Sequence, residues 1–190
     1  MMGLLAGLML ATVDPGISAS PAFDYVEKRQ TYPVHASTRR ELVAALRHAR
    51  TREIDGSGGS VARTSQDLGM RYELEPVAGG CRFKDLQVSL SVTIHLPEWE
   101  PAGRPRESLV ESWTRMRDAL ERHEEGHRDI ALDSADYLHK GLLALGVQKD
   151  CQSLRREAQR LFFRAQLRHS VRDGAYERRT RHGIAQGAVL

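Results

Sequence analysis

Residues 119–132 read ALERHEEGHRDIAL, and this stretch decides how the second half of the chain is organised. It lies in a segment of good helix formers that begins at Pro105, a residue favoured at the first helical position, and contains no further proline. Steps of four and three residues place one series of side chains on a single face of the predicted helix. That series is Leu109, Trp113, Met116, Leu120, His123, His127, Ile130, Ser134, Tyr137 and Gly141. Two histidines therefore belong to the face that we expect to meet the core.

The two histidines have the spacing of a zinc site. Residues four apart on a helix lie about 6 Å from each other, so His123 and His127 can both bind one tetrahedral ion. Glu124 projects about 100° around the same helix, where its carboxylate meets a water on the metal instead of the metal itself. Gly126 keeps the site uncrowded. The pattern predicts zinc at this position and Glu124 as the general base, the alternative being two core histidines that only form hydrogen bonds.

A catalytic zinc ion needs a third protein ligand and an open fourth position. We expect His182, in a polar C-terminal segment that can fold back over the helix, to be that ligand. Asp133 is the alternative, but on an unbroken helix it points about 240° away from His127. The helix would have to break at residue 130, which is isoleucine rather than glycine. His95 and His169 are further candidates.

The first half of the chain predicts a short helix and a small sheet. Thr38 and Glu41 form a capping box before a helix over about 38–50. A Gly/Ser loop follows at 56–59, then a strand over about 61–75 and a turn at Gly79-Gly80. Apolar residues then alternate with polar ones over 88–96, which is typical of a half-buried strand. The predicted fold is α+β and zincin-like, with a small antiparallel sheet packed on the long helix, and the polar face of the 86–96 strand is a place for a peptide to align.

The last predicted helix runs from Cys151 to about His169 and carries an arginine row at positions 156, 160, 164 and 168. A row of this kind is typical of a solvated face, and the alternative is contact with an anionic partner such as a membrane surface or nucleic acid. The formal net charge of the chain is only +3 and no basic arm is present. We therefore expect no nucleic-acid-binding role.

Length and composition favour a single domain over residues 23–190, since 41% of the 190 residues are hydrophobic. The apolar run Met1 to Leu10 is too short to span a bilayer, which needs about 20 residues. We interpret residues 1–22 as a signal peptide that lacks the usual basic start, with small residues Ser20 and Ala22 before the cleavage point. In a periplasmic or secreted protein, Cys81 and Cys151 would form one disulfide, and two buried free thiols are the alternative.

Several motifs together resemble one bacterial family. They are Tyr32-Pro33-Val34, Glu41-Leu42, Cys81, Val92-Thr93-Ile94-His95-Leu96-Pro97 with Trp99, Trp113, the motif from His123 to Ala131, Cys151-Gln152-Ser153-Leu154, and the tail from Tyr176 to Gly183 and Gln186-Gly187-Ala188. The chain resembles, over about 30–190, the domain-of-unknown-function family of predicted secreted zinc-dependent proteases. The family tail reads Tyr-Asp-x-x-Thr-x-His-Gly, so Glu177 replaces an aspartate and the role of this carboxylate stays open.

The resemblance and the zinc motif together predict an exported zinc metallopeptidase that acts on peptides or proteins. In this hypothesis His123, His127 and His182 bind Zn²⁺, Glu124 is the base, and Tyr176 or Arg181 stabilises the oxyanion. One alternative is a zinc-dependent amidase that acts on cell-wall peptides. Another is a non-catalytic envelope binding protein in which the metal is structural.

Overall fold

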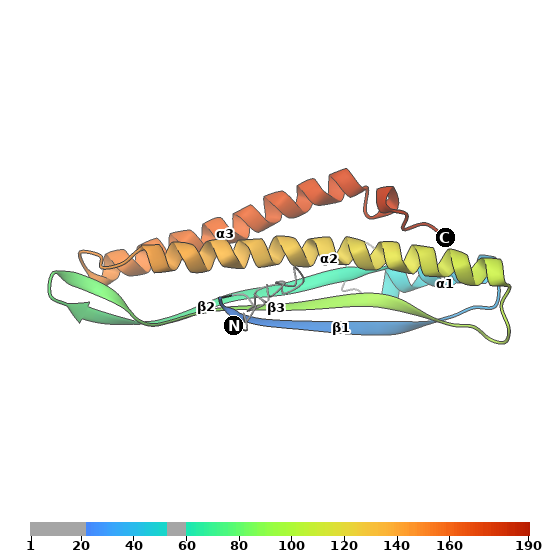
Figure 1. Cartoon of the computed structure of the whole chain (residues 1–190), viewed down its shortest axis with the longest axis horizontal. Helices are drawn as coiled ribbons and strands as arrows, with labels where there is room; N and C mark the ends of the chain where they lie inside the picture. The colour runs from blue at the N-terminus through green and yellow to red at the C-terminus, as the bar shows by residue number, and fades with distance from the viewer. Residues whose placement is uncertain (1–21, 53–59) are drawn as a thin grey trace, which may run out of the picture.

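The computed structural model describes residues 22–52 and 60–190, and these residues form one sheet covered by helices (Figure 1). The elements in chain order are β1 (Asp24–His35), α1 (Arg39–Arg52), β2 (Arg63–Val77), β3 (Gly80–Glu100), α2 (Glu107–Ala144), α3 (Cys151–Thr180) and the short 3-10 helix η1 (Ile184–Gln186). The predicted signal peptide, apart from Ala22, lies outside the described residues.

The sheet has the strand order β1-β3-β2 and is mixed. β2 and β3 form an antiparallel hairpin through Gly79 and Gly80, whereas β1 runs parallel to β3. The prediction of an antiparallel sheet is therefore wrong for β1. Alternating side chains predict a strand but not the direction of its pairing, and a parallel pair needs a long crossover, which α1 and β2 supply here.

β3 is the central strand and the longest of the three. The predicted alternation is confirmed, because five apolar side chains face the core and the intervening serines are exposed. The buried residues are Val88, Leu90, Val92, Ile94 and Leu96. Both edges of β3 are paired, so the expectation that this strand aligns a peptide is wrong. Within the described residues, the edge of β2 that faces away from β3 pairs with no other strand.

α2 covers the sheet, and α3 packs along α2 and also contacts β2 and β3 (Figure 1). The capping box of α1 is confirmed, since the Glu41 carboxylate accepts a hydrogen bond from the Thr38 amide and the Thr38 hydroxyl accepts one from the Glu41 amide. α2 begins at Glu107 with Arg106 as its N-cap, so Pro105 lies just before the helix and not at its first position. The helix continues unbroken past Ile130, as its sequence predicts.

α3 extends beyond its predicted end near His169 and reaches Thr180. Its first turn is capped by Asp150, whose carboxylate accepts a hydrogen bond from the Ser153 amide at 2.6 Å. Cys151, the first residue of α3, forms a disulfide with Cys81 near the start of β3, 70 residues away in sequence. Among the described helices, none is long and apolar enough to cross a membrane.

Candidate metal centre

His123 and His127 lie one turn apart on the face of α2 that contacts α3. Their Nε2 atoms are 3.3 Å from each other, and the imidazole side chains are only 4% and 11% exposed. Burial at the junction of two helices removes the rings from bulk water. The predicted histidine pair is thus present as two neighbouring nitrogen atoms that point into the same space.

Glu177, in the last turns of α3, supplies a third donor to this space. Its Oε1 lies 3.2 Å from Nε2 of His127, and its Oε2 lies 3.6 Å from Nε2 of His123. One donor atom from each of the three residues lies within 4.8 Å of the other two. The cluster of His123, His127 and Glu177 therefore joins α2 to the C-terminal end of α3.

A chain of hydrogen bonds fixes both imidazoles from behind. Nδ1 of His127 lies 2.5 Å from Oδ1 of Asp173, and Nδ1 of His123 lies 2.9 Å from Oε1 of Gln186. The Gln186 amide nitrogen donates to the Tyr176 hydroxyl at 3.2 Å, and this hydroxyl donates to the His123 carbonyl at 3.1 Å. In the neutral tautomer in which each Nδ1 donates to its oxygen acceptor, each Nε2 carries a lone pair that a metal ion can accept.

Two imidazoles and a carboxylate approach one another this closely when a cation lies among them, either a metal ion or the additional proton of a charged His127. Oε2 of Glu177 is buried and has two nitrogen neighbours, Nδ1 of His182 at 2.9 Å and Nε2 of His123 at 3.6 Å. Imidazole nitrogen and carboxylate oxygen in the ratio two to one are a donor set of catalytic zinc sites. The residues present therefore fit a metal ion, with Asp173 and Gln186 orienting the two histidines.

The surroundings shift the pKa values of His123 and His127 in opposite directions. Burial lowers the pKa of His123 below its ordinary value. Burial acts in the same direction on His127, but the hydrogen bond and charge of Asp173 outweigh it and raise the pKa of His127. The same hydrogen bond to His127 lowers the pKa of Asp173, which keeps the Asp173 carboxylate charged.

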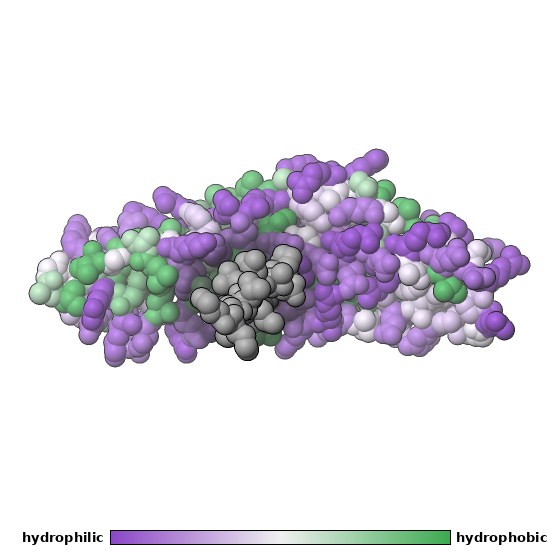
Figure 2. All heavy atoms as spheres, viewed as in Figure 1, coloured by the Kyte–Doolittle hydropathy of each residue, from purple (hydrophilic) through white to green (hydrophobic). Residues whose placement is uncertain are grey.

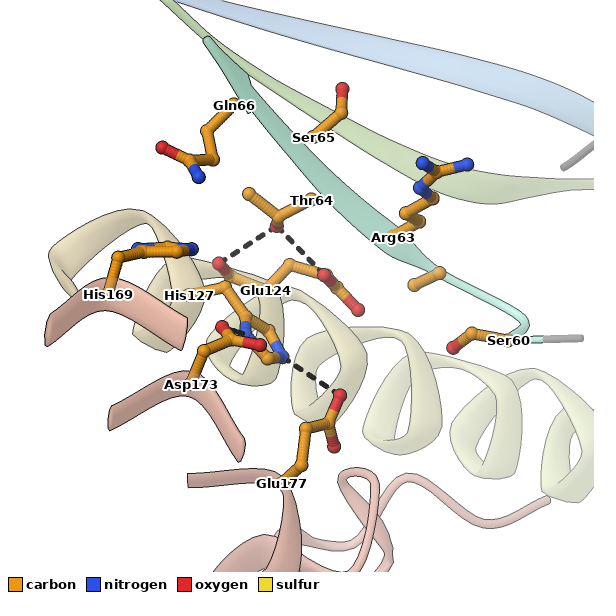
Figure 3. Close-up of a pocket in the computed structure, with 11 residues that line it drawn as sticks. Ser60, Arg63, Thr64, Ser65, Gln66, Glu124, His127, His169, Asp173 and Glu177 are labelled. Atoms are coloured by element: carbon orange, nitrogen blue, oxygen red, sulfur yellow. Dashed lines mark hydrogen bonds and ion pairs between the residues drawn. The ribbon is translucent and has the colours of Figure 1, made fainter. Parts of the chain in front are cut away.

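Glu124 lies beside the cluster, on the side of α2 that faces β2. It is only 2% exposed, and the Thr64 hydroxyl lies 2.8 Å from its Oε2 (Figure 3). Glu124, His127 and Glu177 line one cavity of about 350 Å³ between β2, α2 and α3. Burial raises the pKa of Glu124 to about 7, so its carboxyl group can accept and release a proton near neutral pH.

Gly126 has a specific role in this packing. The ring of Tyr176 lies almost parallel to the His123 ring, with 5.2 Å between centroids, and covers Gly126. A Cβ atom at position 126 would lie 2.1 Å from the Tyr176 hydroxyl oxygen. The glycine inside the histidine motif thus makes room for the tyrosine from α3.

His182 lies at the mouth of the site and outside the three-residue cluster. Its side chain is 79% exposed, and its Nδ1 is 2.9 Å from Oε2 of Glu177. Arg181 is exposed at the end of α3, and the Tyr176 hydroxyl is engaged with the His123 backbone. The structure thus brings the tail to the histidines but places Glu177, and not His182, at their Nε2 atoms.

Of the other candidate ligands, Asp133 and His95 do not line the cavity at this site, whereas His169 does. Asp133 forms ion pairs with Arg168 and Arg172 on α3. His95 lies on β3 between the buried residues Ile94 and Leu96, so its side chain points to the opposite face of the sheet. His169 does line the cavity that Glu124 and His127 share.

Sequence reasoning did not assign Glu177, Asp173, Thr64 or Gln186 to the site. One signal was available for the first two, because Asp173 and Glu177 have the same spacing of four on a helix as His123 and His127. Thr64 and Gln186 carry no local pattern that marks them. Their contacts depend on how β2 and the tail pack against α2.

A mixed sheet beneath a helix with two histidines, and a second helix that adds a glutamate, define an α+β protein with a candidate metal site. The chain belongs to the family described as bacterial protein of unknown function (DUF922), whose model matches residues 29–183. This range contains β3, both long helices and the whole metal cluster. Searches of curated proteins and of solved structures found no match to the chain.

Proposed function

We propose that this protein is an exported zinc metallopeptidase in which His123, His127 and Glu177 bind the zinc ion. The observation that carries the proposal is the set of three oriented donor atoms next to a buried glutamate that is not part of the set. Three protein ligands leave a position open for water and substrate, as in catalytic sites. The Cys81–Cys151 disulfide supports export, because such bonds persist in oxidising compartments.

A bound zinc ion would act as a Lewis acid that activates a water molecule for attack on a peptide carbonyl. Glu124 would accept a proton from that water and pass it to the leaving amine, since it lies beside the three ligands without belonging to them. Thr64 holds the Glu124 carboxylate in place through its hydroxyl. Asp173 and Gln186 hold the two histidine rings, which gives each Nε2 the direction required of a ligand.

The position of β2 supports a peptide as the substrate. Residues 62–66 of this region line the cavity together with Glu124, His127 and Glu177, and the outer edge of β2 is unpaired within the described residues (Figure 3). An extended peptide can hydrogen-bond to such an edge as an added strand. It would then pass directly over Glu124 and the metal ligands.

The experiment compares Glu124→Gln with Glu125→Gln in protein purified from a bacterial periplasm. Zinc content and hydrolysis of an unfolded protein such as casein and of cell-wall peptides are measured. Both variants should keep one zinc ion per chain, whereas only Glu124→Gln should lose at least about 100-fold in rate. Glu125 is the matched control, since its carboxylate pairs with Arg29 away from the cluster. Absence of zinc, or an active Glu124→Gln, would refute the proposal, and cleavage of cell-wall peptides alone would favour the amidase.

A further inference from the structure

The surface of α3 that faces away from α2 is strongly basic. α3 contains eight arginines but only three acidic residues, which are Glu157, Asp173 and Glu177. Asp173 and Glu177 belong to the metal centre, so their charges are directed at the histidines. The arginines of the first two thirds of the helix therefore dominate the charge of its outer side.

Large apolar side chains run through the same surface. Phe163, Leu167 and Val171 are spaced by four and are 65%, 53% and 61% exposed. The helical period places Arg156, Arg160 and Arg164 beside them, whereas the buried residues Ala158 and Ala165 mark the opposite side of α3. We call these six residues, three apolar and three basic, the outer α3 face. In Figure 2, green and purple side chains are interleaved along α3.

Of the three arginines on the outer α3 face, only Arg160 pairs with a carboxylate within the described residues. Arg160 contacts Glu157, and Arg156 donates to the Ser153 hydroxyl. Gln159, Gln166 and Ser170 flank this face on one side and carry no charge, whereas Glu157 flanks it on the other side. Between Arg156 and Arg164 the surface is only shallowly indented and is also lined by Gln159, Arg160 and Phe163. A ligand of this surface must therefore be both anionic and apolar.

We propose that the outer α3 face docks on an anionic lipid surface. Phosphate groups of lipids pair with arginine, while Phe163, Leu167 and Val171 enter the boundary with the acyl chains. Long arginine side chains can extend from the apolar stripe toward the headgroups. A second copy of the chain fits less well, because arginines would face arginines. A nucleic acid would satisfy the charges but leave the three apolar side chains without a role.

This orientation leaves the metal centre accessible. The outer α3 face spans residues 156–171, whereas Tyr176 and Glu177 lie in the last turns of α3 and contact α2. The cavity is lined on α3 by His169, Asp173 and Glu177, which lie on another side of the helix, so a helix bound by the outer α3 face leaves the cavity uncovered. The docking proposal stands on the surface of α3 alone and does not depend on zinc or on hydrolysis.

The test is co-sedimentation of the protein, purified from a periplasm, with vesicles of phosphatidylglycerol and phosphatidylethanolamine or of phosphatidylcholine alone. We expect binding to the anionic vesicles only, weakened by salt. Each arginine near such a surface strengthens binding by about fivefold, so the triple change of Arg156, Arg160 and Arg164 to Gln should weaken it by about 100-fold. Phe163→Ser with Leu167→Ser should weaken it by at least about tenfold.

Matched controls remove the same number of groups elsewhere. The first control changes three exposed arginines to Gln and lowers the net charge by the same amount; they are Arg40, Arg104 and Arg122. The second control, Leu143→Ser with Val147→Ser, removes exposed apolar side chains outside the outer α3 face. These variants should bind as the parent does. The proposal is wrong if the parent ignores anionic vesicles, if the controls lose as much as the α3 variants, or if the serine variants bind unchanged. Circular dichroism of each variant establishes that it is folded.

Discussion

The Tyr176 ring lies directly against Gly126, so a methyl group at position 126 would overlap the phenol. Gly126→Ala gains helix propensity of up to about 1 kcal/mol but forces Tyr176 away from His123. We expect a net loss of about 1–3 kcal/mol in unfolding free energy, together with weaker zinc binding. Urea denaturation with and without zinc measures both effects.

Gly174→Ala is the control for this change. Gly174 also lies inside a helix, but its nearest neighbour to an added Cβ is the end of the Arg178 side chain at 3.5 Å. The substitution should stabilise the protein by up to about 1 kcal/mol and leave zinc binding unchanged. If both alanine variants gain stability, the close contact between Gly126 and Tyr176 has no energetic consequence.

The third zinc ligand can be assigned by metal content. Glu177→Ala should lose most of its zinc, since it removes the carboxylate at the two Nε2 atoms. His182→Ala should retain zinc, because this exposed side chain contacts Glu177 and not the histidine pair. Dialysis against a weak chelator followed by elemental analysis gives the comparison. The reverse pattern would return the ligand role to His182, which the sequence favoured, and loss in both variants would indicate a closed site with four protein ligands.

The buried Glu124 predicts how the metal-free protein responds to pH. Its pKa is about 7 in the folded chain against an ordinary value of 4.5, so the unfolded chain loses this proton first. The stability contributed by the protonated side chain is present below pH 4.5 and is lost as the pH rises through 7. Over this window the unfolding free energy should fall by up to about 3 kcal/mol.

Glu124→Gln should abolish this decrease in unfolding free energy with rising pH, because glutamine does not ionise. In the presence of a chelator, the variant should equal the parent near pH 4.5 and be more stable at pH 8, as measured by denaturation across the pH range. Glu124 and His127 interact electrostatically, so the difference between the two proteins reports the coupled titration of this pair. Equal stability of the variant and the parent at pH 8 would show that ionisation of Glu124 does not destabilise the fold. This result would contradict a raised pKa for Glu124.

Replacement of both Cys81 and Cys151 by serine should reduce the unfolding free energy by up to about 4 kcal/mol, because the disulfide closes a loop of 70 residues. The backbone of Cys81 pairs with Gln148 at both its amide and its carbonyl, so local structure should persist in the variant. Guanidinium denaturation measures the loss. Two thiols open to alkylation in protein from the periplasm would contradict the disulfide.

Local chemistry explains which parts of the fold were predictable. The helix that carries His123 and His127, the capping box at Thr38 and the alternation before Leu96 all arise from residues close in sequence. The parallel pairing of β1 with β3 depends on a crossover, and no local pattern encodes its direction.

The same distinction applies to the site. The spacing of His123, Glu124 and His127 is set within one turn of α2, so it could be recognised from sequence. Glu177 reaches the histidines only because α3 continues past His169 and packs on α2, and Thr64 reaches Glu124 only through the sheet. His182 was a reasonable expectation from residue type, yet two successive left-handed residues, Arg181 and His182, turn the tail at this point.

α3 is anchored at its two ends by different chemistry. A covalent bond at Cys151 tethers the first turn, whereas the last turns contact α2 around the metal ligands. If a metal ion binds this cluster, its loss would loosen the C-terminal end of α3, while the disulfide keeps the first turn in place. Demetallation should therefore be a local and reversible opening, and refilling of the site requires the return of a few turns instead of the refolding of the chain.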